Sequence, residues 1–303
     1  MKGRRLGIPR ALLYYKLGRL WKEAFRALGF EVVTSPQTSE AILKEGLMRS
    51  VSDICLPVKA MLGHVENLKD RVDFLFIPRY VSIEKDAYMC PKFIGLPDVV
   101  RASFENLPPV IDPVYNFKEG NAERLFFKSL SKALALPVGA LKDAFSMAES
   151  STAKTAEPHP GKGRLSIGVV GRPYLVLDEY LSKGIVRSLG ELGVNVLYGE
   201  PSPTEVAECM DSLPKWIYWS MGKETVASAY MYFKDSGVDG IINISNATCG
   251  PDSFTGEVIK RFNEGRPKPY MSLSMDEHTA DAGIQTRLEA FIDMMLLGHG
   301  KER

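Results

Sequence analysis

The chain of 303 residues is long enough for two domains of ordinary size, and its composition, 45% hydrophobic and 25% charged, is that of a globular protein. This composition excludes a disordered, collagen-like or coiled-coil chain. Because 38 lysines and arginines nearly balance 37 aspartates and glutamates, the net charge of +1 provides no broad electrostatic surface for nucleic acid or an anionic membrane.

The amino terminus is basic but lacks the apolar segment of a secretory signal, since Pro9, Arg10, Lys16 and Arg19 interrupt it. No run approaches the roughly 20 apolar residues that a membrane-spanning helix needs. We therefore expect a cytoplasmic protein with neither a membrane nor a nucleic acid as its partner.

Segments typical of strands and helices alternate from the start of the chain. Residues 6–8 are strand-like, apolar residues recur at helical spacing over 13–28, and residues 31–33 are strand-like again. Gly29 predicts the end of that helix. This order is typical of βαβ units and a mainly parallel sheet.

Residues 148–163 interrupt the pattern with a small, polar stretch that contains prolines and glycines and has no apolar periodicity. We interpret it as a linker between an N-terminal α/β lobe, residues 1–147, and a C-terminal α/β lobe, residues 164–303. The second lobe opens with a strand-like segment and a helix predicted over 177–192. The expected fold is two Rossmann- or flavodoxin-like lobes with mostly parallel sheets.

The two halves also resemble each other in detail. Val72-Asp73 precedes one strand-like segment and Val238-Asp239 precedes another, and a loop with a cysteine, Cys90 or Cys249, follows each. All parallel α/β units look somewhat alike, which explains the similarity about equally well. The matched cysteines favour two related lobes and an internal duplication.

Three of the four cysteines, Cys55, Cys90 and Cys249, are followed by a proline within two residues. Proline is favoured in the first turn of a helix, so we expect each thiol at a helix N-terminus. The N–H groups and dipole there favour the thiolate, the form that ligates iron or zinc. Cys209 lies in a helix-like segment without a following proline, which is typical of a buried cysteine, and we exclude it from the site.

The cysteine spacings match neither the pairs of a zinc finger nor the run of a bacterial ferredoxin. The residues alone leave four interpretations open: three unrelated buried cysteines, an iron–sulfur cluster, a zinc site, or thiol redox chemistry. Cys90 and Cys249 follow strand-like segments, so we expect them at the carboxyl ends of parallel strands, where open α/β sheets bind ligands. Two lobes would then present the thiols to one cleft.

Several short motifs occur in an order that resembles a known family. They are Cys55-Leu56-Pro57-Val58-Lys59, Gly63-His64-Val65, Ile77-Pro78-Arg79 and Cys90-Pro91-Lys92 in the first half, and Gly171-Arg172-Pro173-Tyr174, Cys249-Gly250-Pro251-Asp252 and Asp276-Glu277-His278-Thr279 in the second. Together they resemble the domain of proteins related to the activators of 2-hydroxyacyl-CoA dehydratases. That family is similar to the dehydratase subunits and to double-cubane cluster proteins.

The resemblance implies that Cys55, Cys90 and Cys249 are three ligands of an iron–sulfur cluster, either 4Fe–4S or a double-cubane variant. Three thiolates leave one iron with an open position, which suggests reactivity beyond simple electron relay. The resemblance also implies an ATP-hydrolysing activase that supplies an electron at low potential. Because the chain has no phosphate-binding loop of its own, we expect this activase in trans.

Further partners are implied by the same resemblance: a second dehydratase-like subunit or a second copy of the chain, and an acyl-CoA substrate. The chain would then be one component of a dehydratase or reductase system of anaerobic metabolism. Two alternatives stay open. The cysteines can belong to a zinc- or thiol-dependent enzyme, or the two lobes can form a ligand-binding module without catalysis.

Four other residues are weaker candidates. Arg172 can meet the negative charge of a cluster, a carboxylate or a phosphate, although an ordinary ion pair explains it as well. Lys59 and Lys92 can balance the charge of thiolates and sulfide, although such lysines are commonly solvated. His278 follows a strand-like segment and is a weak catalytic candidate as an acid/base or ligand, but its surroundings are also typical of helix capping.

Overall fold

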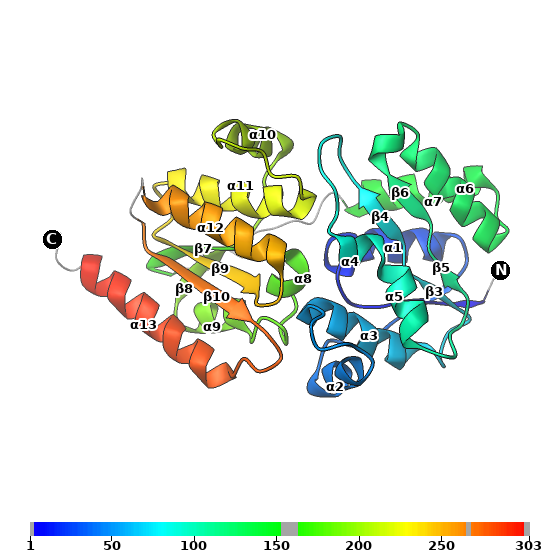
Figure 1. Ribbon diagram of the computed structural model, residues 1–303, viewed down its shortest axis with the longest axis horizontal. Helices are drawn as coiled ribbons and strands as arrows, with labels where there is room; N and C mark the ends of the chain where they lie inside the picture. Colours follow the sequence, from blue (N-terminus) through cyan, green and yellow to red (C-terminus); the bar gives the residue numbers. More distant parts are fainter. Residues whose placement is uncertain (1–2, 153–162, 265–267, 300–303) are drawn as a thin grey trace. The chain divides into compact units, whose positions relative to one another are not determined.

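The computed structural model describes residues 3–152, 163–264 and 268–299. It divides into two compact units, Met1–Ala156 and Glu157–Arg303. Each unit has its own four-stranded parallel sheet with helices on both faces (Figure 1). The mixed α/β architecture and the mostly parallel sheets confirm the predicted fold class.

The first unit contains, in chain order, β1 (Arg5–Ile8), α1 (Tyr14–Ala27), β2 (Glu31–Thr34), α2 (Glu40–Met48), α3 (Leu56–Leu68), β3 (Phe74–Phe76), β4 (Arg79–Ser82), α4 (Pro91–Ile94), α5 (Leu96–Ser103), β5 (Val110–Ile111), β6 (Val114–Asn116), the 3-10 helix η1 (Phe117–Glu119), α6 (Ala122–Leu134) and α7 (Val138–Thr152). The second unit contains β7 (Leu165–Gly171), α8 (Pro173–Val176), α9 (Ile185–Glu191), β8 (Val194–Leu197), α10 (Pro203–Asp211), α11 (Ser220–Lys234), β9 (Gly240–Asn246), α12 (Gly250–Glu264), β10 (Tyr270–Met275) and α13 (Asp281–His299).

The two main sheets share one strand order. The order is β2-β1-β3-β5 in the first unit and β8-β7-β9-β10 in the second, so that each unit's first strand lies second from the edge. All pairs within these sheets are parallel. The connections therefore change direction at β1 and at β7, which makes the carboxyl ends of these strands the expected ligand-binding edge of each unit. A separate two-stranded parallel sheet of β4 and β6 was not predicted.

The same pair of hydrogen bonds links the first and third strands of both units. The Asp73 carboxylate accepts from the backbone N–H of Arg5 at 2.7 Å, and the Asp73 N–H donates to the Arg5 carbonyl at 2.8 Å. Asp239 makes both bonds with Ser166, again at 2.7 and 2.8 Å. The shared strand order and these equivalent bonds support the internal duplication that the two Val-Asp motifs suggest.

The expected linker differs from the structure at its start. It was predicted over 148–163, but α7 continues to Thr152, so the first five of these residues are helical. Residues 153–162 lie outside the described part of the chain. The small residues at 148–152 are compatible with a helix, so composition alone places the start of the linker too early.

The helix predicted over 177–192 is wrong in its first half, since only Ile185–Glu191 forms α9. The Asp178 carboxylate instead accepts the backbone N–H groups of Tyr180 and Leu181, which stabilises a turn. Lys183 and Gly184 then adopt φ values of 55° and 64°, which a right-handed helix cannot contain.

The core of the second unit includes Cys209. This residue is completely buried in α10 and packs in one apolar cluster with residues of α11, β9 and α12, among them Val226, Ile241 and Ile259. Ser202 begins α10 with a reciprocal capping box to Glu205. The cap and the buried face together explain why the Cys209 segment is helical.

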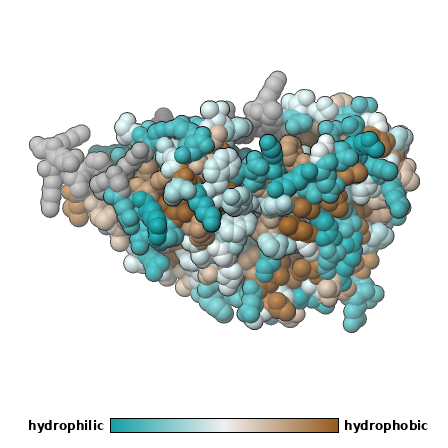
Figure 2. All heavy atoms as spheres, turned by 45° about the horizontal axis from the view of Figure 1, so that its top comes forward, coloured by the Kyte–Doolittle hydropathy of each residue, from teal (hydrophilic) through white to brown (hydrophobic). Residues whose placement is uncertain are grey.

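The surface that Figure 2 presents mixes apolar and hydrophilic side chains. Among the residues that the structure describes, no helix combines the length and the apolar character needed to cross a membrane.

Candidate functional site

The three cysteines that precede prolines each stand directly before a helix. Cys55 and Cys90 are the N-cap residues of α3 and α4, with extended backbone angles. The carbonyl of Cys249 accepts the N–H of Ser253 at 3.0 Å and so begins the hydrogen bonding of α12. The prediction of cysteines at helix N-termini is confirmed for all three.

These positions suit a thiolate to different degrees. The helices α3 and α12 have 13 and 15 residues, so their N-termini carry a substantial partial positive charge. Helix α4 has only four residues and contributes less at Cys90. All three thiols are partly exposed, and the four cysteines form no disulfide.

Cys209 has the opposite surroundings. Its side chain is completely buried, and this burial, together with Glu208, raises the pKa of its thiol to about 12. The protonated, inaccessible thiol acts as a small apolar residue, as the sequence predicts.

Cys90 does not lie directly at the end of a strand of the main sheet. The chain first forms β4 of the small sheet and a loop, and the N–H of Met89 then returns to the Val81 carbonyl at 2.9 Å. Arg79 of β4 donates to the carbonyl of Ile94 and forms a salt bridge of 2.7 Å with Asp98, which fastens α4 and α5 to this strand. Cys249 thus directly follows β9, as predicted, whereas Cys90 follows the parallel strand β4 of the small sheet after a loop.

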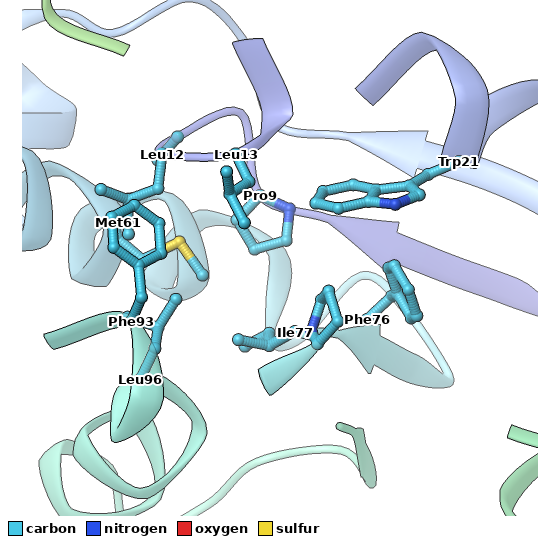
Figure 3. Close-up of a pocket in the computed structure, with 11 residues that line it drawn as sticks. Pro9, Leu12, Leu13, Trp21, Met61, Phe76, Ile77, Phe93 and Leu96 are labelled. Atoms are coloured by element: carbon cyan, nitrogen blue, oxygen red, sulfur yellow. The ribbon is translucent and has the colours of Figure 1, made fainter. Parts of the chain in front are cut away.

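The helices that begin at Cys55 and Cys90 meet at a small apolar cavity of about 20 Å³. Met61 of α3 and Phe93 of α4 both line it, together with Leu96 of α5 (Figure 3). Packing in the first unit thus holds the two cysteine-bearing helices against a common set of side chains.

A buried ion pair lies beside Cys249. Arg172 follows β7 and caps α8, and its Nε donates to Asp252 Oδ1 in the first turn of α12 at 2.7 Å. The two side chains are only 4% and 6% exposed. Burial alone would lower the pKa of Arg172, but the carboxylate of Asp252, with contributions from Tyr174 and Cys249, raises it above its ordinary value. Arg172 and Cys249 are thus near enough for their charges to interact.

Two buried N–H donors near Cys249 have no hydrogen-bond acceptor among the described residues. They are Nη1 of Arg172 and Nδ2 of Asn246, the last residue of β9. The other amide atom, Asn246 Oδ1, accepts from the N–H and hydroxyl of Thr248, and the Asn246 backbone N–H donates to Asp252. A buried donor without an acceptor costs about 1–3 kcal/mol. Both donors are therefore available to a further acceptor, such as a water molecule or a sulfur atom.

The sequence analysis does not single out Asn246 or Asp252 for this role. The signal for Asp252 is its place three residues after Cys249, in the first turn of a helix. Asn246 could be recognised from Asn246-x-Thr248, which forms a side-chain turn here, but only the structure identifies its second amide atom as unpartnered.

The two lysine candidates differ in their surroundings. Lys59 in the first turn of α3 is 1% exposed, and its N–H bonds to the Cys55 carbonyl. Lys92 is exposed. Lys59 therefore adds a positive charge in low dielectric to the helix that Cys55 begins, whereas the charge of Lys92 is screened by solvent.

His278 is exposed and lies in a capping turn before α13. Its backbone N–H donates to Asp276 Oδ1 at 3.0 Å, and the Thr279 hydroxyl donates to the same oxygen at 2.8 Å. The bond from Thr279, joined by that from His278, lowers the pKa of Asp276. These contacts are typical of helix capping, the alternative to a catalytic role for His278.

Within the described ranges, no three histidine, cysteine, aspartate or glutamate side chains gather as a group that could hold a metal ion. Cys55 and Cys90 belong to the first compact unit and Cys249 to the second. The structure thus describes the immediate surroundings of each thiol separately.

The described residues thus form an α/β protein in which three partly exposed cysteines each stand before a helix. Residues 5–200 match the family model described as the CoA enzyme activase uncharacterised domain, which covers more than half of the chain. The chain belongs to this family. Residues 202–295 match the model of the 2-hydroxyglutaryl-CoA dehydratase D-component.

The comparison with curated proteins finds no match. Among solved structures, the apo form of the dinucleotide forming acetyl-coenzyme A synthetase 1 of Ca. Korarchaeum cryptofilum aligns with 98% of this chain and 68% of its own. The sequence identity is 11%, and the TM-score of 0.22 is too low to indicate a common fold.

Proposed function

We propose that this chain is a component of an activase-dependent 2-hydroxyacyl-CoA dehydratase or a related low-potential reductase, in which Cys55, Cys90 and Cys249 ligate an iron–sulfur cluster. The observation that carries the proposal is the setting of Cys249, a partly exposed residue at a helix N-terminus beside two buried donors that have no acceptor among the described residues. The matches to an activase-related family and to a dehydratase component supply the chemical class.

The residues around the cysteines suit a cluster. The N–H groups at the starts of α3 and α12 favour the thiolate form of Cys55 and Cys249. Arg172 Nη1 and Asn246 Nδ2 can donate to sulfur, and such hydrogen bonds tune the reduction potential of a cluster. Lys59 adds positive charge that offsets the charge of thiolates and sulfide, whereas the charge of Arg172 is balanced by Asp252.

A bound cluster would supply one-electron chemistry, and three protein thiolates would leave one iron with a position for water, substrate or another ligand. The role of the chain is then to hold this group, balance its charge and limit its contact with water. The acyl-CoA substrate follows from the dehydratase-component match, and an electron at low potential would come from an ATP-hydrolysing activase acting in trans.

The test is ATP-dependent reduction of protein that has been purified and reconstituted without oxygen. The visible absorption is followed after addition of dithionite and the activase of a 2-hydroxyacyl-CoA dehydratase system, with ATP or with a non-hydrolysable analogue. We expect bleaching only with activase and hydrolysable ATP, retained in Cys209→Ala and lost in Cys249→Ala. Equal reduction without activase or ATP, or a colourless protein, would contradict the proposed function.

A further inference from the structure

The first unit contains a buried polar cluster that the proposed function does not use. It lies where β1 and β2 end side by side, since Ile8 and Thr34 are paired in register at the end of the two strands. Arg10 follows β1, Ser35 and Thr38 follow β2, and His64 comes from α3. The cluster therefore occupies the carboxyl edge of the sheet beside its first strand, the position at which α/β sheets bind ligands.

The loop after β2 forms hydrogen bonds with both Arg10 and His64. Ser35 Oγ accepts the backbone N–H of Arg10 at 2.8 Å, and Thr38 Oγ1 lies 3.0 Å from His64 Nε2. Ser35, Thr38 and His64 are buried, and His64 is completely so. The residues after β2 thus contact both the backbone of Arg10 and the ring of His64.

Each of these two side chains has a buried nitrogen without a partner among the described residues, namely Nε of Arg10 and Nδ1 of His64. Burial, reinforced by the charge of Arg10, lowers the pKa of His64 to about 3, so the ring is neutral. When the Thr38 hydroxyl donates to Nε2, the ring proton is on Nδ1 and this atom becomes a donor. The cluster then offers two N–H donors and one positive charge.

The helix that carries His64 is held rigidly. Helices α2 and α3 cross so closely that a Cβ on Gly63 would lie 1.9 Å from the Ile42 carbonyl oxygen, and one on Gly46 would lie 1.8 Å from that of Lys59. Contact between the two backbones leaves α3 little freedom to move. The donor positions are therefore set before any ligand arrives, which lowers the entropic cost of binding.

The second unit provides an internal comparison. There too an arginine follows the first strand, but Arg172 is neutralised by Asp252 of the same unit. Arg10 forms no ion pair with a carboxylate among the described residues, and its guanidinium lies 5.9 Å from the ring centroid of Tyr14. Arg10 is partly exposed, so water can reach its guanidinium, whereas an anion would also neutralise the charge.

We propose that Arg10 and His64 form a binding site for a small oxyanion, either a carboxylate or a phosphoryl group, at the carboxyl edge of the first sheet. The oxygens accept from Arg10 Nε and His64 Nδ1, and the anion neutralises the guanidinium. This site needs no metal and is independent of the proposed cluster.

The experiment is calorimetric titration of the purified, cluster-free protein with potassium phosphate and, separately, with sodium acetate, at an ionic strength held constant with chloride. We expect saturable binding of at least one anion, which Arg10→Gln weakens at least about tenfold because a charge-assisted hydrogen bond is lost. Arg26→Gln removes an exposed arginine of the same unit and should leave the Kd unchanged. Phosphate binding alone identifies a phosphoryl site, and acetate binding alone identifies a carboxylate site.

His64 is followed in the wild type, so that the readout comes from the ring itself and needs no substitution of this completely buried residue. In protein labelled with ¹⁵N-histidine, the Nδ1 resonance of His64 should have the chemical shift of an N–H nitrogen, and the anion should perturb it with the same Kd as the calorimetry. Binding that is absent, unaffected by Arg10→Gln, or silent at His64 would overturn the proposal. The same titration with Cys249→Ala should give the wild-type Kd, so that failure of the cluster hypothesis and failure of this one are distinguishable.

Discussion

The guanidinium of Arg172 donates to the carboxylate of Asp252 at 2.7 Å, and the two residues join the end of β7 to the first turn of α12. Both side chains are almost completely buried. The pair connects two strand-end loops of the second unit beside Cys249. It therefore positions Nη1 of Arg172, which has no acceptor among the described residues, in the neighbourhood of that cysteine.

Breaking this pair should be costly, since either single substitution leaves an uncompensated charge in a buried place. We expect Arg172→Gln and Asp252→Asn each to lower the free energy of unfolding by about 3–5 kcal/mol, measured by urea denaturation. Arg187→Gln is a matched control, because the Arg187–Glu179 pair of the same unit is 62% and 57% exposed. Its cost should stay below about 1 kcal/mol. Equal effects of the buried and exposed substitutions would refute this assignment.

The close crossing of α2 and α3 predicts a second difference in stability. Gly63→Ala would force a Cβ against the Ile42 carbonyl oxygen, so the helices must separate, and we expect a loss of about 2–4 kcal/mol in urea denaturation. At Gly139 in α7 a Cβ meets nothing within 4 Å. Gly139→Ala should therefore be neutral or stabilising by up to about 1 kcal/mol. A tolerated Gly63→Ala would show that the backbones are not in contact.

The low pKa of His64 gives the stability a pH dependence of known sign. The unfolded chain protonates this ring near pH 6.5, whereas in the folded state its pKa is about 3. The unfolded state thus binds more protons between these values, and stability falls as the pH decreases. We expect the free energy of unfolding of the wild type, measured by urea denaturation in chloride buffers, to fall by about 2 kcal/mol between pH 7 and pH 5. This fall is relative to the change in His64→Gln over the same range. Parallel pH profiles for the two proteins would mean that the ring is accessible to protons.

The four thiols should differ in reactivity in cluster-free protein. Cys55, Cys90 and Cys249 are partly exposed, whereas Cys209 is buried with a thiol pKa of about 12. We expect three thiols to react with an aromatic disulfide reagent at pH 8 and the fourth only after denaturation. Loss of one fast-reacting thiol in Cys249→Ala, but of none in Cys209→Ala, would verify the assignment. A fast reaction of Cys209 would be inconsistent with its burial.

Local signals account for what the sequence predicts correctly. Proline within two residues of Cys55, Cys90 and Cys249 predicts their helix-start positions because proline and the free N–H groups of a first turn act within a few residues. The hydrophobic periodicity predicts the alternating strands and helices in the same way. The helix expected from residue 177 fails because a local side-chain bond from Asp178 competes with helical hydrogen bonding.

The remainder of the site depends on contacts between distant residues. Arg172 and Asp252 are 80 positions apart, and Thr38 and His64 are 26 apart. Nothing in the periodicity of either segment says that these side chains meet, or that Asn246 keeps a buried N–H without an acceptor. The sequence also does not reveal that β4 and its partner β6 form an additional parallel sheet before Cys90.

The most direct test of the central claim measures iron and acid-labile sulfide per chain in protein purified without oxygen. The iron and sulfide contents and the visible spectrum are compared between the wild type and four variants, Cys55→Ala, Cys90→Ala, Cys249→Ala and Cys209→Ala. The account predicts about four irons with matching sulfide for a 4Fe–4S cluster, lost in the first three variants and retained in Cys209→Ala. A wild-type protein that stays free of iron after anaerobic reconstitution, or iron that survives all four substitutions, would contradict it.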